Sequence, residues 1–456
     1  MRLAIQQLTE EPGCDHNQKK TAEQKKEACK KPTPGATAGG CAFDGAQIVL
    51  LPVADAAHII HGPITCCGQS YNNRGTRTTA GNLHQYGMTT DMSELDIVFG
   101  GEKKLKASVR HVAAKFKPKA IFIYSTCVTA MTGEDIHTVA KEMTEELGMQ
   151  VVPVDSPGFS GSKNLGNKFA GNALFEHVIG TKEPESIPMF PINLIGEYNI
   201  AGELYQVQPL FDELGITLFS KMTGNAAYEE LCHAHRSKLS VVICSRALIS
   251  IARQLDEKYG IPYFEGSFYG MGETKRTLMS IAEQMGSDLL KRKVEELTAR
   301  KEKETYERLA PYLPKMKGKK VLVYTGGVKS WSVLKQLEEM GMEVIKSSTR
   351  KSTEEDIARI LDYFEGNEDG LMPKGDGKTL LKYMKEYDAD LFLAGGRNMY
   401  NAMKGQVPFV DVNQERHFAF AGYEGSVVLA QKICATLESP VFQLVKKPAP
   451  WEVSFG

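Results

Sequence analysis

Short apolar runs alternate with amphipathic helical stretches along most of this chain, and no other feature restricts the fold as strongly. Strands that alternate with helices in this way form parallel sheets with helices on both faces. We therefore predict an α/β protein built from consecutive doubly wound, Rossmann-like domains. The predicted strands are Ile48–Val53, Ile97–Phe99, Ile121–Tyr124, Val151–Val152, Ile192–Ile195, Leu239–Ile243, Lys320–Tyr324, Val344–Ile345 and Leu391–Leu393. A short helix through Ala56, Ile59 and Ile60 is predicted after the first of these strands.

The alternation restarts twice, which indicates three such domains. A length of 456 residues allows about three domains of roughly 150 residues each. The first residues are rich in lysine, glutamate and glutamine, which is typical of an extended arm. We place this arm at residues 1–38, a first α/β domain at 39–190, a second at 191–316, and a third with a C-terminal tail at 317–456.

Charge and hydropathy exclude several classes of protein. The chain has 55 basic and 56 acidic side chains, so no excess of basic charge points to nucleic acid or to an anionic membrane. No apolar run reaches the roughly 18 residues that span a bilayer, and the N-terminus lacks the plan of a signal peptide. We therefore expect a cytoplasmic protein, in which nine cysteines, an odd number, serve more readily as ligands than as disulfides.

Three cysteines stand beside glycine or at an expected strand end, where we expect loops. Cys41 follows a glycine pair, Cys66 begins a Cys-Cys-Gly sequence, and Cys127 follows the predicted strand Ile121–Tyr124. Thiolates delivered from loops suit a soft metal or an iron–sulfur cluster; the alternative is small buried side chains that pack beneath loops. A cubane takes four ligands, so the fourth must be Cys67, a solvent or substrate atom, or a residue of another chain. Adjacent cysteine side chains diverge, so we favour a partner subunit.

Cys244 is a separate candidate because it ends the predicted strand Leu239–Ile243. It is either a core thiol or the single protein tether of a second metal ligand. Arg246 and the start of the following helix would lower the pKa of this thiol and favour the thiolate. The sequence assigns no role to Cys14, Cys29 or Cys67.

The segment Thr325–Ser330 connects a predicted strand to a predicted helix and contains two glycines and a lysine. Backbone N–H groups in such a turn, together with the lysine, can form a cradle for an anion. Gly395–Asn398 repeats this arrangement after a later strand. Basic residues of other glycine-rich loops could face the same anion, although each could equally be a solvated surface charge. The candidates are Gly326, Gly327, Lys329, Arg74, Arg77, Lys163 and Lys404.

Several sequence blocks together resemble the α-subunit family of nitrogenase component 1, and within it the branch that assembles the cofactor. The resemblance covers nearly the whole chain from residue 10 onward. It implies the three-domain fold of that family. The most specific blocks are PGATAGGCAFDGAQI, HGPITCCG, STCVTA, NLIGEYNIAGE, PYFEGSFYG, YTGGVKSW, AGGRNMYNAMKG and FVDVNQER.

The resemblance implies a role for each candidate cysteine. Cys41, Cys66 and Cys127 match the α-side ligands of the cluster at the subunit interface. In the assembly branch this cluster is a 4Fe-4S cubane that one cysteine of the partner NifN completes within an α2β2 heterotetramer. Cys244 matches the tether of the catalytic cofactor, which here implies holding an eight-iron, carbide-containing precursor.

Three departures separate this chain from the catalytic subunits that it resembles. Those subunits bind molybdenum through a histidine, whereas Asn413 stands in the matching run here. They carry a second histidine near the reactive irons, where this chain has Asn167, and an arginine beside the cofactor, where it has Lys329. A cluster held by one thiolate and by electrostatic contacts can be released, which suits a scaffold.

The resemblance therefore implies cofactor assembly rather than turnover of a small substrate. The precursor would come from NifB, the Fe protein NifH would deliver molybdenum and homocitrate, and the apo molybdenum-iron protein would accept the product. One alternative is a catalytic subunit or related reductase, in which His417 could replace the missing ligand at Asn413. Another is a module that only stores clusters.

Overall fold

The computed structural model describes residues 40–73, 76–79, 81–243, 245–349, 352–373, 375–413 and 417–445. This part of the chain forms two compact units, and each is described by itself. Unit 1 contains the described residues up to Ile200 together with Ile216–Glu265. Unit 2 contains Ala201–Gly215 and the described residues from Gly266 onward.

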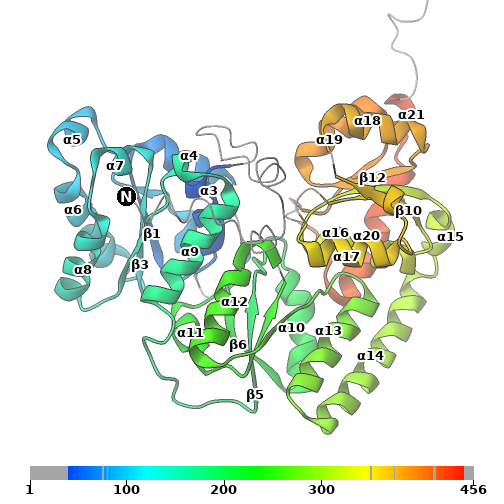
Figure 1. Cartoon of the computed structure of the whole chain (residues 1–456), viewed down its shortest axis with the longest axis horizontal. Helices are drawn as coiled ribbons and strands as arrows, with labels where there is room; N and C mark the ends of the chain where they lie inside the picture. The colour runs from blue at the N-terminus through cyan, green and yellow to red at the C-terminus, as the bar shows by residue number, and fades with distance from the viewer. Residues whose placement is uncertain are drawn as a thin grey trace, which may run out of the picture. The chain divides into compact units, whose positions relative to one another are not determined.

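Three parallel sheets confirm the predicted α/β fold (Figure 1). Unit 1 holds the first two, with strand orders β2-β1-β3-β4 and β6-β5-β7-β8, and unit 2 holds the third, with order β11-β10-β9-β12-β13. All pairings between the described strands of these sheets are parallel. The strands are β1 (Ala57–His61), β2 (Met88–Thr89), β3 (Ile121–Ser125), β4 (Val151–Val154), β5 (Phe190–Ile195), β6 (Ile216–Met222), β7 (Leu239–Val242), β8 (Tyr263–Glu265), β9 (Lys320–Tyr324), β10 (Glu343–Ser348), β11 (Leu371–Met372), β12 (Leu391–Ala394) and β13 (Phe409–Asp411).

Most predicted strands are confirmed, and the domain boundaries at 190 and 316 stay a prediction. The confirmed strands are those expected at 121–124, 151–152, 192–195, 239–243, 320–324, 344–345 and 391–393.

Helices cover both faces of the first sheet. In β3, Phe122 and Tyr124 pack against α3 and α9, while Ile121 and Ile123 pack against α6 and α8. A strand buried on both faces has no polar side, which is why β3 reads as a continuous apolar run. The helices of unit 1 are α3 (Ala42–Leu50), α4 (Ile64–Asn73), α5 (Glu94–Phe99), α6 (Glu102–Phe116), α7 (Cys127–Thr132), α8 (Ile136–Leu147), α9 (Lys163–His177), α11 (Tyr228–His233) and α12 (Ser245–Tyr259), with short 3-10 turns at Leu83–Gln85, Gly158–Ser160 and Ala234–Arg236.

The helices α3 and α9 cross so closely that only glycine fits at the crossing. A Cβ atom on Gly45 would lie 1.9 Å from the carbonyl oxygen of Lys163, and one on Gly166 would lie 1.8 Å from that of Ala42. Such distances are far inside van der Waals contact, so the two glycines allow backbone to pack directly on backbone. The crossing fixes the start of α3, where Cys41 lies.

The prediction for residues 48–60 was wrong in order. We expected a strand at Ile48–Val53 followed by a helix through Ala56, Ile59 and Ile60, but α3 comes first and β1 follows. Almost every residue of α3 is buried, so this helix has no polar face from which a helical period could be read. All five residues of β1 are buried as well, which removes the alternation that marks an exposed strand.

The predicted strand Ile97–Phe99 is also wrong, because these residues end α5. Ser93 and Asp96 form a capping box that starts this helix. The apolar run lies on the surface instead of in a sheet: Val98 is 72% exposed and Phe99 is 82% exposed.

Unit 2 surrounds the third sheet with helices. Leu322 and Phe392 of its central strands are completely buried, and Trp331 of α16 donates a hydrogen bond of 2.8 Å to Asp356 of α17. Its helices are α10 (Glu203–Leu214), α13 (Met271–Gln284), α14 (Asp288–Leu309), α15 (Leu313–Met316), α16 (Lys329–Glu339), α17 (Glu354–Tyr363), α18 (Gly377–Glu386), α19 (Met399–Gly405), α20 (Gly422–Leu437) and α21 (Pro440–Val445), with 3-10 turns at Glu368–Gly370 and Gly396–Asn398.

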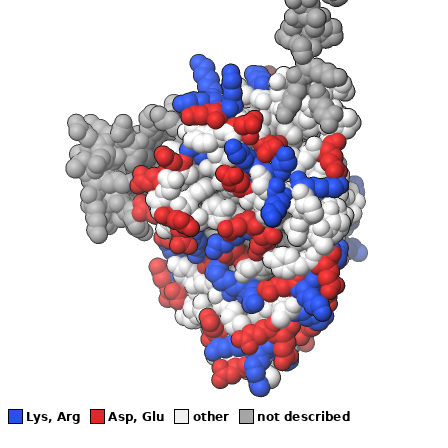
Figure 2. All heavy atoms as spheres, turned by 90° about the vertical axis from the view of Figure 1, so that its right-hand side faces the viewer, with Lys and Arg blue, Asp and Glu red and all other residues white. Residues whose placement is uncertain are grey.

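The surface agrees with the balanced composition. Figure 2 shows Lys and Arg side chains interspersed with Asp and Glu side chains on the face that it draws, with no broad patch of one sign. Within the described ranges, none of the helices is both long and apolar enough to cross a membrane.

Candidate metal-cluster site

The three candidate cysteines each lie at the start of a helix. Cys41 is the N-cap residue of α3, Cys66 is the third residue of α4, and Cys127 is the first residue of α7. We expected all three in loops, and for Cys66 and Cys127 this was wrong. Helix N-termini carry partial positive charge, which favours thiolate over thiol.

Gly158 shows how closely two of these sulfur atoms approach. A Cβ atom on Gly158 would lie 3.0 Å from Sγ of Cys127 and 3.1 Å from Sγ of Cys41. The two sulfur atoms are therefore no farther apart than the sum of these distances, yet both cysteines are free thiols. Sequence reasoning missed Gly158, because Pro157-Gly158 signals a turn and says nothing of what the turn faces.

Cys66 belongs to the same group. Burial first, and then the neighbouring thiols of Cys127, Cys41 and Cys67 in that order, together raise its pKa to about 11. Binding of metal would reverse this preference, because thiolates coordinate metal after losing the proton. The structure thus brings together the three cysteines that the sequence singled out.

Cys67 differs from its neighbour in surroundings. It is 5% exposed and packs in the hydrophobic core of unit 1, where burial alone raises its pKa. Cys66 is more exposed. The two side chains therefore diverge as expected, and Cys67 is poorly placed to supply a fourth ligand.

The donor set fits an iron–sulfur cluster better than a single ion. No group of three His, Cys, Asp or Glu side chains converges on one metal position in the described ranges. In a cubane each cysteine binds a different iron, so its ligands surround the cluster without meeting at a point. Three half-buried thiols at helix starts match three such corners and leave one for another donor.

Apolar side chains are exposed on the same short helices. Ile64, two residues before Cys66, is 59% exposed, and Met131, four residues after Cys127, is 80% exposed. Phe159, next to Gly158, is 43% exposed. Exposed apolar side chains that gather around a site are typical of a protein interface.

The other candidates of unit 1 lie in two anchored segments. The main chain of Arg77 donates to the carbonyl of Asn199 at 2.9 Å and accepts from the Asn199 amide at 2.6 Å, while the residue itself is exposed. Lys163 is the first residue of α9, half-buried, and its N–H donates to the carbonyl of Gly40 at 3.2 Å.

In unit 2 the structure brings Lys329 close to the loop that carries Asn413. The ammonium of Lys329 donates to the carbonyl of Val412 at 2.8 Å and lies 4.5 Å from the ring centre of Tyr269. Asn413 follows directly, and its Cβ lies 3.3 Å from the position of a Cβ on Gly395. These residues follow the carboxyl ends of β9, β12 and β13, where ligands of parallel sheets usually bind.

The remaining candidates divide between described and undescribed residues. In the turn before Lys329, Gly326 is half-buried and Gly327 has a φ of 60°. His417 is exposed. Cys244, Arg74, Cys14 and Cys29 lie outside the described residues.

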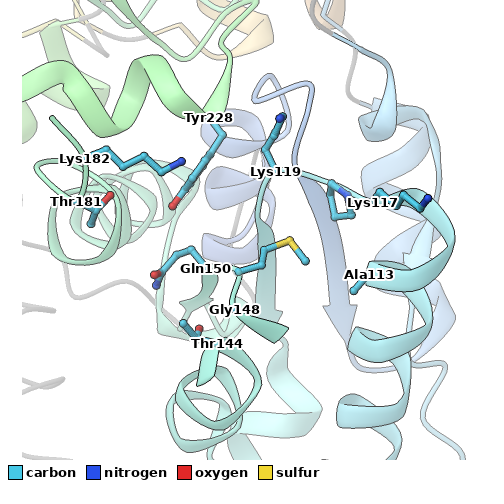
Figure 3. A pocket seen from close by; sticks show the side chains of 11 residues that line it. Ala113, Lys117, Lys119, Thr144, Gly148, Gln150, Thr181, Lys182 and Tyr228 are labelled. Carbon is cyan, nitrogen blue, oxygen red and sulfur yellow. The ribbon is translucent and has the colours of Figure 1, made fainter. Parts of the chain in front are cut away.

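A pocket of about 660 Å³ lies at the amino-terminal edge of the first sheet, before β3 and β4. The three cysteines lie at the other, carboxyl-terminal edge of this sheet. Lys117, Lys119 and Lys182 line it, but Figure 3 shows their ammonium groups pointing in different directions. Tyr228 and Gln150 complete part of its wall. Since no charged groups converge there, the pocket is a surface hollow without the features of a site.

Comparison with known proteins agrees with the fold and the cysteine pattern. Residues 41–438 match the family described as nitrogenase component 1 type oxidoreductase. Two similar proteins carry the name nitrogenase iron-molybdenum cofactor biosynthesis protein NifE. The one from Nostoc sp. is 49% identical, with 99% of this chain and 94% of that protein covered. The one from Klebsiella pneumoniae is 47% identical, with 97% and 98% covered.

A solved structure titled "Nitrogenase Cp1 at pH 6.5" has the same fold. The TM-score is 0.83 at 24% sequence identity, with 96% of this chain and 99% of that chain covered. The matched region includes all three cysteines of the site as well as the three parallel sheets. The chain belongs to the nitrogenase component 1 type oxidoreductase family.

Proposed function

We propose that this chain is the scaffold subunit on which the nitrogenase iron-molybdenum cofactor is assembled. The observation that carries the proposal is that three half-buried thiols lie near one another: Cys41 and Cys127 meet at Gly158, and both of their thiols act on the pKa of Cys66. The names of the similar proteins support the same conclusion. The proposed compartment is the cytoplasm.

The three thiolates hold three irons of a resident 4Fe-4S cluster, and one cysteine of the partner subunit NifN holds the fourth. The burial of Cys67 in the core supports a ligand from another chain. The exposed Ile64 and Met131 support a protein surface that covers the site. Two such pairs form an α2β2 heterotetramer. The bound cluster supplies electron transfer.

A second, larger cluster is the cargo. Cys244 tethers the eight-iron, carbide-containing precursor that NifB supplies, while NifH brings molybdenum and homocitrate. The finished cofactor then passes to the apo molybdenum-iron protein. Candidates for contacting the anionic cargo are Arg77 and Lys163 of unit 1 and Gly326, Gly327, Lys329 and Asn413 of unit 2.

Two asparagines suit a scaffold that must release its cargo. Neither Asn413 nor Asn167 can bind metal as firmly as the histidine that catalytic subunits carry at the matching place. Asn167 is 5% exposed, and its side-chain oxygen has no hydrogen-bond partner among the described residues. Such an acceptor can receive a hydrogen bond from a bound ligand without holding it permanently.

The resident cluster is tested by anaerobic purification of the complex with its partner. Iron content and the EPR spectrum of the reduced complex are measured for the wild type and for Cys41→Ala, Cys66→Ala and Cys127→Ala. Each variant is expected to lose the cubane signal. Cys67→Ala is the matched control and is expected to keep it. Retention of the signal in all three variants would refute the assignment of these ligands.

The cargo is tested separately through Cys244→Ala. We expect the variant to lose the iron of the larger cluster and to keep the cubane. Cys232→Ala, which truncates a completely buried cysteine of α11, is the control for unit 1. Wild-type complex given NifH, molybdate and homocitrate should also activate the apo molybdenum-iron protein. Substrate reduction without that acceptor would indicate a catalytic subunit instead.

A further inference from the structure

A buried carboxylate, Glu134, lies between α7 and α8, seven residues after Cys127. Its side chain is 4% exposed. One carboxylate oxygen accepts the N–H of Gly101 at 2.5 Å, and the other lies 3.3 Å from Nε2 of His61. The N–H of Glu134 donates to the carbonyl of Thr129 at 3.1 Å, which closes the turn that Cys127 begins.

The partners of His61 determine where its proton lies. Its side chain is completely buried at the end of β1, and Nδ1 lies 3.1 Å from the hydroxyl of Thr90. The carboxylate of Glu134 can only accept, so Nε2 carries the proton that lies between the two groups, while burial of the ring lowers its pKa and favours the neutral form. Nδ1 of the neutral ring then accepts the hydroxyl proton of Thr90, whose oxygen also accepts the N–H of Gly62 at 3.1 Å. His61 is therefore neutral with the proton on Nε2, and this proton is donated to Glu134.

Two segments meet at this pair. On one side the carbonyl of His61 accepts the hydroxyl of Thr126 at 3.0 Å, and Thr126 is the N-cap residue directly before Cys127. On the other side Gly101 follows α5, whose exposed end carries Phe99. A Cβ atom on Gly101 would lie 2.9 Å from Cε1 of His61, so this segment packs tightly on the imidazole ring.

We propose that Glu134 is a positioning residue that holds the end of α5 and the turn carrying Cys127 in one rigid arrangement. The inference rests on the proposed function in one respect, namely that Cys127 binds the resident cluster. Truncation of Glu134 leaves the Gly101 N–H and the His61 Nε2–H without an acceptor inside the protein. Both segments then loosen together, because the same carboxylate anchors each of them.

The conservative variant Glu134→Gln separates a hydrogen-bonding role from a charge role. The amide oxygen can still accept the N–H of Gly101. The amide NH2 then faces Nε2 of His61, which can accept if the imidazole proton moves to Nδ1 and is donated to Thr90. We therefore expect Glu134→Gln to restore most of what Glu134→Ala removes.

The test uses the complete complex with its partner subunit. Hydrogen exchange of peptides covering residues 94–101 and 127–133 is followed for the wild type, Glu134→Ala and Glu134→Gln. The EPR spectrum and the midpoint potential of the cubane are measured on the same samples. For Glu134→Ala we expect exchange in both peptides to be about tenfold faster, together with a shifted spectrum and potential. For Glu134→Gln we expect values close to the wild type.

Glu146→Gln is the matched control, since it removes an exposed carboxylate of α8 that pairs with Arg110 at 2.6 Å. It should change neither exchange nor spectrum. Unchanged exchange of both peptides in Glu134→Ala would overturn the inference. If Glu134→Ala fails to fold, the test uses Glu134→Gln alone. The inference would then be overturned if the exchange rates and the EPR spectrum of Glu134→Gln differed from the wild type as much as those of Cys127→Ala do. A wild-type complex without the cubane would instead refute the proposed function. The hydrogen-exchange rates would still show whether Glu134 holds the two segments.

Discussion

The two edges of the first sheet carry very different surroundings. At the carboxyl edge, β1 leads into the helix of Cys66 and β3 into that of Cys127, and Cys41 lies close to both thiols. The buried pair of His61 and Glu134 lies at the same edge, with each polar group of that pair matched to a partner. At the amino edge lies an open pocket of about 660 Å³ with lysines that do not converge. A cavity with charges nearby is therefore weaker evidence for function than a few buried groups whose partners are all accounted for.

Helix direction explains part of this difference. After a parallel strand the next helix begins, so the carboxyl edge receives helix N-termini, which favour thiolates. The amino edge receives helix ends: α6 ends before Lys117 and α8 ends before Gly148. A lysine beside a helix C-terminus is favourable without any ligand, which accounts for Lys117 at the end of α6.

The largest expected effect contrasts the tight packing behind the carboxyl edge with the open amino edge. Gly166→Ala would force the α3 and α9 backbones apart and should lower the free energy of unfolding by about 3 kcal/mol or more. Gly148→Ala places a methyl group in open space at a φ of 60° and should cost only about 1 kcal/mol. Thermal unfolding of both variants measures the difference. Equal losses would show that the two edges are packed alike.

A smaller effect is expected at the cluster itself. Gly158→Ala crowds the sulfur atoms of Cys41 and Cys127, which must shift by a few tenths of an ångström. We expect iron to be lost to a chelator about tenfold faster, with an unfolding temperature close to that of the wild type. Gly68→Ala, where a methyl group meets nothing within 4 Å, is the control. The same rate of iron loss in both variants would contradict the packing of the thiols around Gly158.

The pH dependence of stability should reveal the buried histidines of β1. Burial lowers the pKa of His58 from 6.5 to about 3, although a hydrogen bond to the carbonyl of Val53 opposes the shift. Below pH 6.5 the unfolded chain binds a proton that the folded chain does not, so stability is full above that pH and falls below it. Between pH 6.5 and 5.5 this loss is about 1 kcal/mol.

His61 contributes to the same pH dependence of stability. Burial lowers its pKa as well, but the carboxylate of Glu134 partly offsets this. Unfolding curves measured across this pH range for His58→Gln and Glu134→Gln separate the two contributions. His58→Gln should flatten the pH dependence. Glu134→Gln should steepen it, because His61 loses a charge that favours its protonated form. A pH dependence that neither variant alters would show that other groups cause it.

The smallest effect is expected at the amino edge. Lys119→Ala and Lys182→Ala remove exposed charges without an ion-pair partner among the described residues, and each should change stability by less than about 0.5 kcal/mol. Iron content and cofactor maturation should stay at wild-type levels. A marked loss of iron or of cofactor maturation would show that the pocket is a functional site, and the contrast between the two edges of the sheet would then be wrong.

The sequence predicts the architecture well and the local surroundings of the site less well. Strand and helix alternation is a long-range pattern, so β3, β9 and β12 were predicted close to their observed bounds. The order of α3 and β1 was wrong because both are buried on all sides and carry no polar period.

The cysteines of the site could be predicted from their neighbours, but their supporting residues could not. Gly158, His61 and Glu134 have ordinary sequence surroundings, and only folding brings them to the cysteines. The opposite surroundings of Cys66 and Cys67 follow from the direction of α4, which was predicted as a loop. The position of Cys244 relative to any cargo stays a prediction.

The exposed Ile64 and Met131 have a consequence for production of the protein. Under the proposed function a partner subunit covers these side chains, so in a chain made alone the apolar groups beside the thiols stay in contact with water. Excess synthesis of this chain alone would then end in precipitated or oxidised material. The yield of working complex would depend on matched expression of two genes more than on the robustness of either product.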